Sequence, residues 1–326
     1  MSGLRGCVLI STGGTIASRR DASGVARPEV SAAGLLAAVP DATNVARLYA
    51  EEVFCLPSPH IGPPEWRLLH RALVSALDRD DVAGAVVSHG TAVMEETAWF
   101  LDLTINHEKP IILTGAQRNA SEAESDGPRN LLDAIRIAVS PSARNKGVLV
   151  ALNQHINAAR DVIKTHSFNV ETFYSGERGF LGQVSPEKVT FYREPIQRLH
   201  IPLRECGLPV VEIISMYAGA SGALMRAAAS HARGIVVQAV GGGHVNPDLF
   251  TAISNAIASG ITVVVATRSP HGGTRAGYGF TGSSRDLQQA GAILSGDLNA
   301  WKARILLSLA LQNNLAHSDI EELFQT

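Results

Sequence analysis

Short apolar runs alternate with longer amphipathic stretches along the first 190 residues. The runs typical of buried strands are 8–10, 85–88, 111–114 and 148–152. The stretches with helical character are 32–39, 64–77, 94–101 and 130–139. This alternation predicts a parallel sheet whose strands are joined by crossover helices.

A second set of elements follows an irregular segment. Residues 193–204 carry two prolines and show neither helical nor strand periodicity. The elements expected after them are strands at 210–214, 235–239 and 261–266 and a final helix at 301–311. The second part of the chain is therefore also expected to be α/β.

The length agrees with two domains, because 326 residues exceed what one hydrophobic core usually serves. We predict an α/β protein with a larger N-terminal catalytic domain (1–191), which holds a mostly parallel sheet flanked by helices. A linker (192–208) and a smaller C-terminal α/β domain (209–326) complete the expected organisation.

Composition argues against several classes of partner. Lys and Arg number 28 against 30 Asp and Glu and are scattered along the chain, so nucleic acid is not an expected partner. The N-terminus shows no export signal, and no apolar run approaches the roughly 20 residues of a membrane helix. The three cysteines, Cys7, Cys55 and Cys206, form no metal-binding or redox pattern. These features predict a cytoplasmic protein without a membrane segment, a metal site or a cofactor.

Two glycine-threonine loops are the candidate chemistry. Residues 11–17 follow the strand at 8–10, and residues 89–92 follow the strand at 85–88. Glycines at the end of a strand expose backbone amides to a bound group, and a neighbouring threonine hydroxyl can attack that group. Thr15 is the first choice for a nucleophile, and the alternative is that it caps a helix.

The two loops, Thr12-Gly13-Gly14-Thr15-Ile16-Ala17 and 89–98, resemble the signatures of the bacterial-type L-asparaginase/glutaminase family. Further similar segments are 110–116, 125–131, 160–165 and 302–307. The resemblance implies an amidohydrolase that needs no cofactor and acts on a small-molecule amide. It also implies a homo-oligomer, a dimer or tetramer, in which a neighbouring subunit closes the site at the carboxyl edge of the first sheet.

The resemblance assigns roles to individual residues. Thr15 is the attacking threonine, and Thr91 with Lys164 handles protons, which requires a neutral lysine whose pKa is lowered by burial. The implied substrate-binding residues are Gly14, Ser58, Gly90, Ala92 and Ala116. Among them, Ser58 holds a carboxylate of the substrate and the backbone carbonyl of Ala116 faces the leaving amide. Ser58 lies between two prolines, so a plain turn residue is the alternative for it.

The chain departs from the family where the family binds an α-ammonium group. Ala92 replaces an aspartate, Pro59 replaces a glutamine, and the segment 269–276 contains no counterpart of a glutamate. A loop tyrosine is also missing, and Val25 takes its approximate place. The same loop contains Arg19, Arg20 and Arg27, which either meet an anionic substrate or are solvated charges.

Three readings of function follow from these departures. A chain selected for asparagine should not lose all three ammonium-binding groups, because leaving one buried charge unpaired costs several kcal/mol. The preferred reading is therefore an asparaginase-like enzyme that hydrolyses a small carboxamide lacking the α-ammonium. The alternatives are an L-asparaginase weakened by the change at Ala92 and a non-catalytic ligand-binding protein on the same fold.

Overall fold

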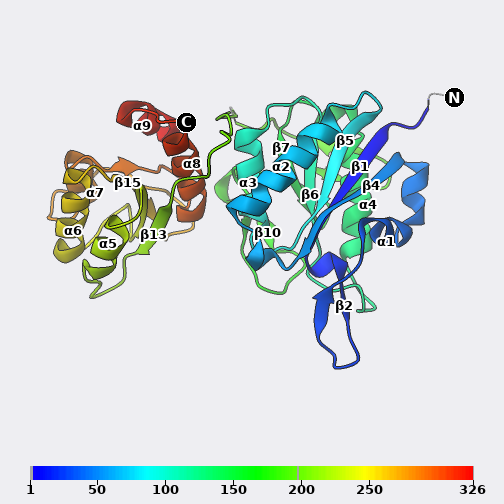
Figure 1. Ribbon diagram of the computed structural model, residues 1–326, viewed down its shortest axis with the longest axis horizontal. Coiled ribbons are helices and arrows are strands. Elements are labelled where there is room, and N and C mark those ends of the chain that lie inside the picture. The colour runs from blue at the N-terminus through cyan, green and yellow to red at the C-terminus, as the bar shows by residue number, and fades with distance from the viewer. Residues whose placement is uncertain (1–2, 197, 326) are drawn as a thin grey trace. The chain divides into compact units, whose positions relative to one another are not determined.

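The computed structural model describes residues 3–196 and 198–325, and the chain divides into two compact units. Unit 1 spans Met1–His200 and unit 2 spans Ile201–Thr326. Figure 1 shows both units along the chain, with unit 1 in blue to green and unit 2 in green to red. Each unit has its own sheet and its own core.

Unit 1 is built on an eight-stranded sheet in the order β12-β11-β8-β7-β6-β5-β1-β4. Its strands are β1 (Gly6–Gly13), β4 (Arg47–Leu56), β5 (Val82–Ser88), β6 (Ile111–Thr114), β7 (Val148–Leu152), β8 (His155–Ala158), β11 (Gly182–Val184) and β12 (Val189–Phe191). The five strands from β4 to β7 run parallel, and the remaining three add in antiparallel fashion. Except for the edge strand β4, the parallel strands are nearly continuous apolar runs because helices cover both of their faces.

Two helices cover each face of this sheet. They are α1 (Ala32–Ala37), α2 (Pro63–Leu77), α3 (Met94–Thr104) and α4 (Gly127–Ala138). Leu35 of α1 and Leu131 of α4 share a core with Leu9 of β1. On the other face α2 and α3 pack together, and the ring of Trp66 stacks on Phe100 with centroids 5.1 Å apart.

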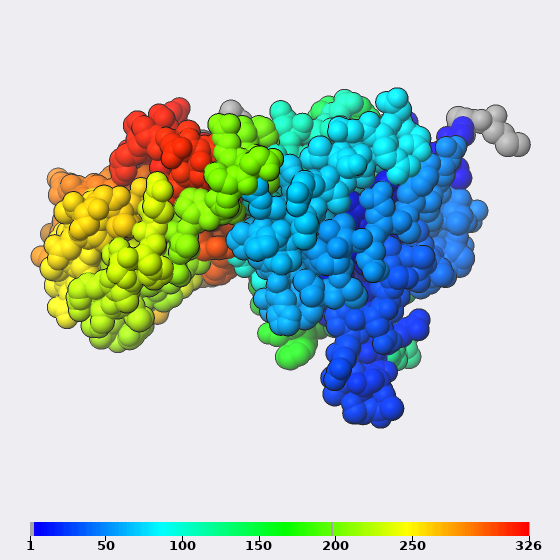
Figure 2. Space-filling model, in the orientation of Figure 1, coloured from blue at the N-terminus to red at the C-terminus, as the bar shows by residue number. Residues whose placement is uncertain are grey.

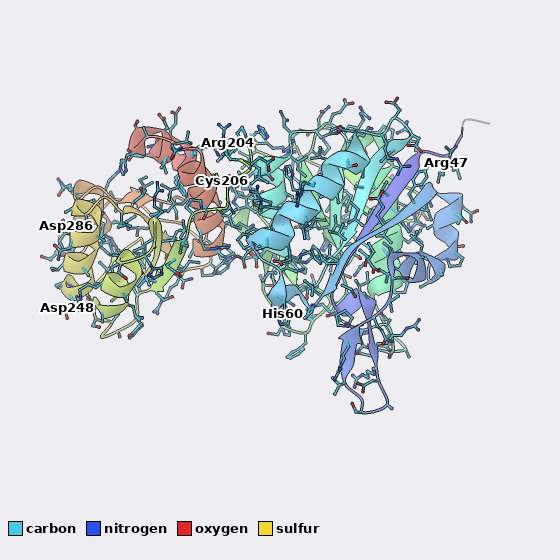
Figure 3. All side chains as sticks on the ribbon, viewed as in Figure 1. Arg47, His60, Arg204, Cys206, Asp248 and Asp286 are labelled. Carbon is cyan, nitrogen blue, oxygen red and sulfur yellow. The ribbon has the colours of Figure 1, made fainter. Side chains whose placement is uncertain are left out.

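The loops that leave the parallel strands gather at one edge of the sheet. A short helix, η1 (Thr15–Ala17), follows β1, and a hairpin of β2 (Ser18–Arg20) and β3 (Ala26–Pro28) extends away from it. The hairpin forms a separate dark blue projection on the surface of unit 1 (Figure 2). His60, which Figure 3 labels, lies at the same end of unit 1. This edge is where α/β proteins usually bind ligands.

Unit 2 has a four-stranded parallel sheet in the order β13-β14-β15-β16. Its strands are β13 (Val211–Ser215), β14 (Gly234–Ala239), β15 (Thr262–Thr267) and β16 (Ile293–Leu294), and its helices are α5 (Ala223–Ala229), α6 (Pro247–Ala258), α7 (Ser284–Gln289), α8 (Ala300–Gln312) and α9 (His317–Gln325). Side-chain caps begin α6, α7 and α8. The first turns of α6 and α7 contain Asp248 and Asp286 (Figure 3), which is favourable at the positive end of a helix.

The predicted fold class is confirmed, since both units are α/β and the larger sheet is mostly parallel. The strands expected at 111–114 and 148–152 have those bounds in the structure. The expectation that 301–311 is the final helix is wrong, because α9 follows it and buries Ile320 and Phe324. Within the described ranges, no helix has both the length and the apolar character needed to cross a bilayer.

Candidate active site

Three segments of unit 1 meet where the backbones of Gly14 and Gly90 touch. A Cβ atom on Gly14 would lie 2.3 Å from the Cα of Gly90, and Gly14 has a φ of +80°. A Cβ atom on Gly90 would lie 2.6 Å from the Oγ of Ser58. Only glycine fits at either position, and the absence of side chains brings the β1, β4 and β5 loops into direct contact.

Thr15 and Thr12 differ in what their hydroxyls do. Thr12 is fully buried, and its Oγ1 donates a hydrogen bond to the carbonyl of Ser88 at 2.8 Å, which joins β1 to β5. Thr15 is half-buried at the first position of η1. Its hydroxyl has no hydrogen-bond partner among residues 3–196 and 198–325. Thr12 is therefore a structural residue, and Thr15 keeps its hydroxyl available.

Thr91 and Lys164 are in direct contact. Lys164 lies in the short strand β9 (Ile163–Lys164), which pairs with β10 (Phe173–Tyr174). Its Nζ is 2.7 Å from Oγ1 of Thr91. The backbone amide of Lys164 donates to a carboxylate oxygen of Glu95 at 3.2 Å, which fixes β9 beside α3.

The environment of Lys164 shifts the pKa of its amine downward. Burial lowers the pKa of the Lys164 amine below its usual value, and the negative charge of Glu95 opposes this in part. A buried ammonium loses hydration, so the amine gives up its proton more readily than an exposed lysine does. The amine can then accept a proton from a hydroxyl or a water beside it.

Gln117 joins this pair and was not among the predicted site residues. Its Oε1 accepts hydrogen bonds from Oγ1 of Thr91 at 2.8 Å and from Nζ of Lys164 at 3.0 Å. Its loop follows β6 and is held by Asp126, whose carboxylate accepts the backbone amides of Gln117 and Arg118 at 2.9 to 3.1 Å. The only signal in the sequence is that Gln117 follows the end of a third parallel strand.

The predicted substrate-binding residues lie beside these loops. Ser58 is buried at the start of η3 (Ser58–His60), and its Oγ accepts the backbone amide of Ala92 at 3.2 Å. The side chain of Ala92 is exposed, and neither Ala92 nor Pro59 carries a charged or amide group. Ala116 is fully buried, so its contribution to a ligand is limited to its backbone.

The β2–β3 hairpin contains Arg19, Arg20 and Arg27. Arg20 lies 3.6 Å from a carboxylate oxygen of Glu122, and Arg27 lies 3.9 Å from one of Asp21. All four side chains are substantially exposed, so these pairs contribute little to stability. Val25 is half-exposed in the connection between the two strands.

His89 precedes the second loop but is fully buried. Burial lowers the pKa of its imidazole to about 4, and Nδ1 lies 2.7 Å from the carbonyl oxygen of Gly90. His89 is therefore neutral near pH 7 and acts as a packed residue that supports the loop. Across the described ranges, no three His, Cys, Asp or Glu side chains group in a way that could hold a metal ion.

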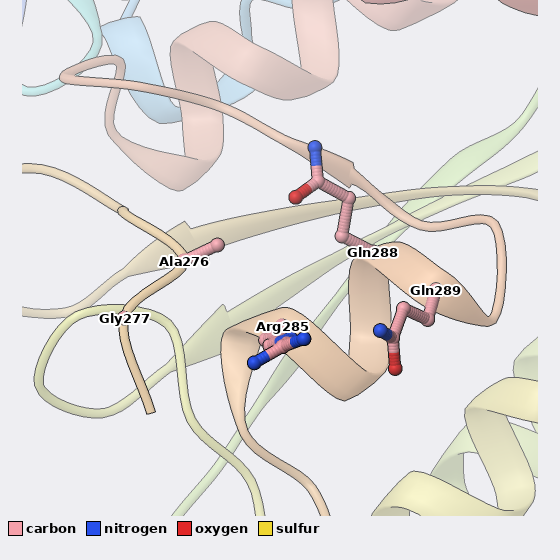
Figure 4. Close-up of a pocket in the computed structure, with 5 residues that line it drawn as sticks. All are labelled: Ala276, Gly277, Arg285, Gln288 and Gln289. Atoms are coloured by element: carbon pink, nitrogen blue, oxygen red, sulfur yellow. The ribbon is translucent and has the colours of Figure 1, made fainter. Parts of the chain in front are cut away.

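A hollow of about 460 Å³ lies in unit 2. Figure 4 shows Arg285, Gln288 and Gln289 projecting from α7 and Ala276 with Gly277 on the preceding segment. One guanidinium and two amides offer hydrogen bonds, but no nucleophile or carboxylate accompanies them in the lining. The hollow therefore contributes no hydrolytic chemistry.

Comparison with known proteins agrees with this geometry. Residues 7–197 match the family described as Asparaginase, N-terminal, and residues 210–324 match the Glutaminase/Asparaginase C-terminal domain. The chain is 35% identical to a probable periplasmic L-asparaginase of Haemophilus influenzae, over 97% of this chain and 91% of that protein. It is 34% identical to L-asparaginase 2 of Escherichia coli, with the same coverage.

A solved structure is similar over the full length. The crystal structure of a probable cytoplasmic L-asparaginase from Campylobacter jejuni matches with a TM-score of 0.88 and 34% identity. The match covers 99% of each chain.

Proposed function

The chain belongs to the bacterial-type asparaginase/glutaminase family, and we propose that it hydrolyses a small carboxamide that carries a carboxylate but no α-ammonium group. Enzymes named L-asparaginase are amidohydrolases acting on linear amides, and this chain is one of that class. The observation that carries the catalytic part is the 2.7 Å contact between Thr91 and a lysine whose pKa is lowered.

Thr15 is the proposed nucleophile. Its hydroxyl oxygen attacks the amide carbon, and backbone amides near Gly14 and Thr91 stabilise the negative charge on the carbonyl oxygen. The hydroxyl proton is transferred to the amide nitrogen, the carbon–nitrogen bond breaks, and ammonia leaves an ester on Thr15. A water molecule then attacks the ester carbon, which releases the carboxylate and restores the hydroxyl.

Thr91 and Lys164 move the protons in these steps. The neutral amine of Lys164 takes a proton from Thr91, which in turn takes one from the attacking water. The reaction needs no oxidant because hydrolysis changes no oxidation state, and a general base beside a hydroxyl supplies the proton transfers that acyl transfer requires. Activity should therefore rise as the pH increases through the pKa of Lys164.

The substrate follows from positions 58, 59 and 92. Ser58 can donate its hydroxyl hydrogen to a substrate carboxylate, while its oxygen accepts the amide of Ala92. The neighbouring Ala92 and Pro59 offer a methyl group and a ring, which cannot pair an ammonium ion. A dicarboxylic acid monoamide such as succinamate fits this pattern, because its charge is confined to the carboxylate.

Asparagine is the second candidate substrate. The relatives at 34 to 36% identity are named L-asparaginases, which favours it. In that case the change at Ala92 weakens binding of the α-ammonium without removing the catalytic groups.

Ammonia release from succinamate, asparagine, glutamine and longer carboxy-amides at pH 8 tests the proposal. We expect succinamate to have the highest kcat/KM and the Lys164→Met variant to release none above background. Arg118→Met, which removes a neighbouring exposed side chain, is the matched control and should retain the wild-type rate. Release from asparagine alone would favour the second candidate, and ligand binding without ammonia from any amide would contradict hydrolysis.

We also place the enzyme in the cytoplasm as a homo-oligomer. The name of the Campylobacter jejuni relative and the three free cysteines support this location, although the Haemophilus influenzae relative is named periplasmic. Cell fractionation checks the location, and light scattering after gel filtration checks whether the protein is a dimer or a tetramer.

A further inference from the structure

Gln117 has a hydrogen-bonding pattern that serves the two proposed proton-handling residues. Its Oε1 is shared between Thr91 at 2.8 Å and Lys164 at 3.0 Å, while those two side chains are 2.7 Å from each other. The three polar groups thus form a closed triangle. No side chain at position 92 competes for either partner, since Ala92 has no acceptor.

The orientation of the Gln117 amide is determined by its other end. Nε2 donates to the carbonyl oxygen of Asn169 at 3.0 Å and faces that of Ser167 at 3.3 Å. Carbonyl oxygens only accept, so the NH₂ group must point at them and the amide oxygen must point at Thr91 and Lys164. A flipped amide would lose these contacts and place donors against the ammonium.

The backbone of Gln117 is fixed as well. Asp126, at the start of α4, accepts the backbone amide of Gln117, and the side chain of Asn130 donates to Asp126 at 3.0 Å. Asn130 also donates to the carbonyl of Gly115 at 3.0 Å. The loop that carries Gln117 is therefore anchored to the helix behind it, and the side chain starts from a defined position.

We propose that Gln117 is a positioning residue, which orients the amine of Lys164 and the hydroxyl of Thr91 for proton transfer. This inference rests on the proposed function. With Lys164 protonated, the ammonium donates to Thr91, and the Thr91 hydroxyl donates to Gln117. With Lys164 neutral, one N–H stays on Gln117, so that the lone pair of the amine faces the Thr91 hydroxyl. One acceptor serves both states without moving.

A neutral acceptor suits this role better than a carboxylate. An anion 3 Å from the amine would favour the ammonium and raise the pKa of Lys164. Glu95 on α3 is the charged group that already acts in this direction, and burial opposes it. On the other elements around the amine, Asp126 faces backbone amides and Nδ1 of His166 accepts the amides of Phe168 and Asn169. Gln117 holds the amine without adding charge.

Two substitutions separate the hydrogen bond from the charge. Gln117→Met keeps the length of the side chain and removes the acceptor, whereas Gln117→Glu keeps the acceptor and adds a negative charge. Arg118→Met is the matched control in the same loop, because the contacts it removes are those of an exposed guanidinium with the carboxylate and the backbone carbonyl of Glu124. For each protein, kcat and KM for the amide that the wild type hydrolyses are measured over a pH range that includes both the acid limb and the alkaline plateau of the wild type.

For Gln117→Met we expect kcat to fall about 10- to 100-fold with KM changed less than about threefold, as for a buried donor left without its acceptor. For Gln117→Glu the acid limb of the pH profile should move up by about one pH unit, and the alkaline plateau should recover to within about threefold of wild type. Recovery by the isosteric acid distinguishes positioning from a purely structural role. Unchanged kcat in Gln117→Met, or an unmoved limb in Gln117→Glu, would overturn the proposal.

A second readout does not depend on turnover. Competitive acetylation followed by mass spectrometry measures the pKa of Lys164, with the exposed Lys188 as the internal reference. If the wild type releases ammonia from no amide, the proposed function fails, and this titration decides about Gln117 alone. A rise of about one pH unit in Gln117→Glu supports the contact, and the same titration curve in wild type and Gln117→Glu contradicts it.

Discussion

Ala92→Asp places a carboxylate where the proposed substrate specificity is decided. The side chain at 92 is exposed, and its backbone amide lies 3.2 Å from Oγ of Ser58. An aspartate there extends into solvent-accessible space, so the fold should tolerate it. The new carboxylate would lie close to the α-ammonium of an asparagine whose carboxylate is held by Ser58.

The expected gain follows from Coulomb's law. Two unit charges about 4 Å apart interact by about 4 kcal/mol at an effective dielectric constant of about 20. Exposure at position 92 and screening by salt reduce this to about 1 to 2 kcal/mol. Because about 1.4 kcal/mol is tenfold, kcat/KM for asparagine should rise about 5- to 30-fold. For succinamate it should fall, because the new carboxylate repels an anion without an ammonium.

The pH dependence must be separated from this effect. In the wild type, burial lowers the pKa of Lys164. A carboxylate next to Thr91 would raise that pKa, because a nearby negative charge favours the ammonium. The neutral amine is the active form, so activity is present above this pKa and is lost as the pH falls through it. The acid limb of Ala92→Asp should therefore move to higher pH, and the two proteins are compared on their alkaline plateaus.

The assay is ammonia release from asparagine and from succinamate across the pH range. Ala227→Asp, which adds the same charge at an exposed alanine of α5, controls for net charge. The reasoning would be refuted if asparagine kcat/KM on the plateau stayed unchanged or fell while succinamate hydrolysis was unaffected.

Three further predictions concern the nucleophile, the glycine contact and the buried histidine. Thr15→Ala should abolish ammonia release and prevent an acyl adduct on the 11–17 peptide in mass spectra, with thermal stability retained; an adduct on Thr91 instead would reassign the nucleophile. Gly14→Ala should lower the free energy of unfolding by more than about 3 kcal/mol, because its Cβ would lie 2.3 Å from Gly90, whereas Gly24→Ala, with φ of +82° and nothing within 4 Å, should cost about 1 kcal/mol. His89 should lower the free energy of unfolding by about 2 kcal/mol between pH 7 and pH 5, because the unfolded imidazole binds a proton near pH 6.5 and the folded one only near pH 4. Urea unfolding at several pH values measures this, and the same dependence of the unfolding free energy on pH in His89→Asn would contradict it.

Fully buried parallel strands were the easiest elements to predict. β6 and β7 are buried at every position, and Thr114 is the one polar residue in them, because helices cover both faces; their bounds could therefore be read from composition alone. β4 is partly exposed at the edge of the sheet and mixes charged with apolar residues, and no apolar run marks it. The position of a strand in the sheet, which is a tertiary property, therefore decided whether the sequence pattern could predict it.

Some residues of the candidate site could be predicted from the sequence, and others could not. The two glycine-threonine loops carry a local signal, because glycine is required where the backbones of Gly14 and Gly90 touch. Gln117 has no such signal, since its importance depends on β9 passing beside the loop after β6, and that proximity arises only in the folded chain. The roles of Thr15, Thr91 and Lys164 are still predictions, although the structure brings Thr91 and Lys164 together.

Direct competition between the two proposed substrates tests the central claim. Wild-type enzyme is given equimolar succinamate and asparagine at pH 8, and both products are followed in one sample by NMR, so that their ratio equals the ratio of kcat/KM values. The account predicts that succinate forms at least about tenfold faster than aspartate, because a bound asparagine leaves its α-ammonium without a partner and a penalty of about 1.4 kcal/mol is tenfold. Faster formation of aspartate would show that the enzyme recognises the α-ammonium and would contradict the account.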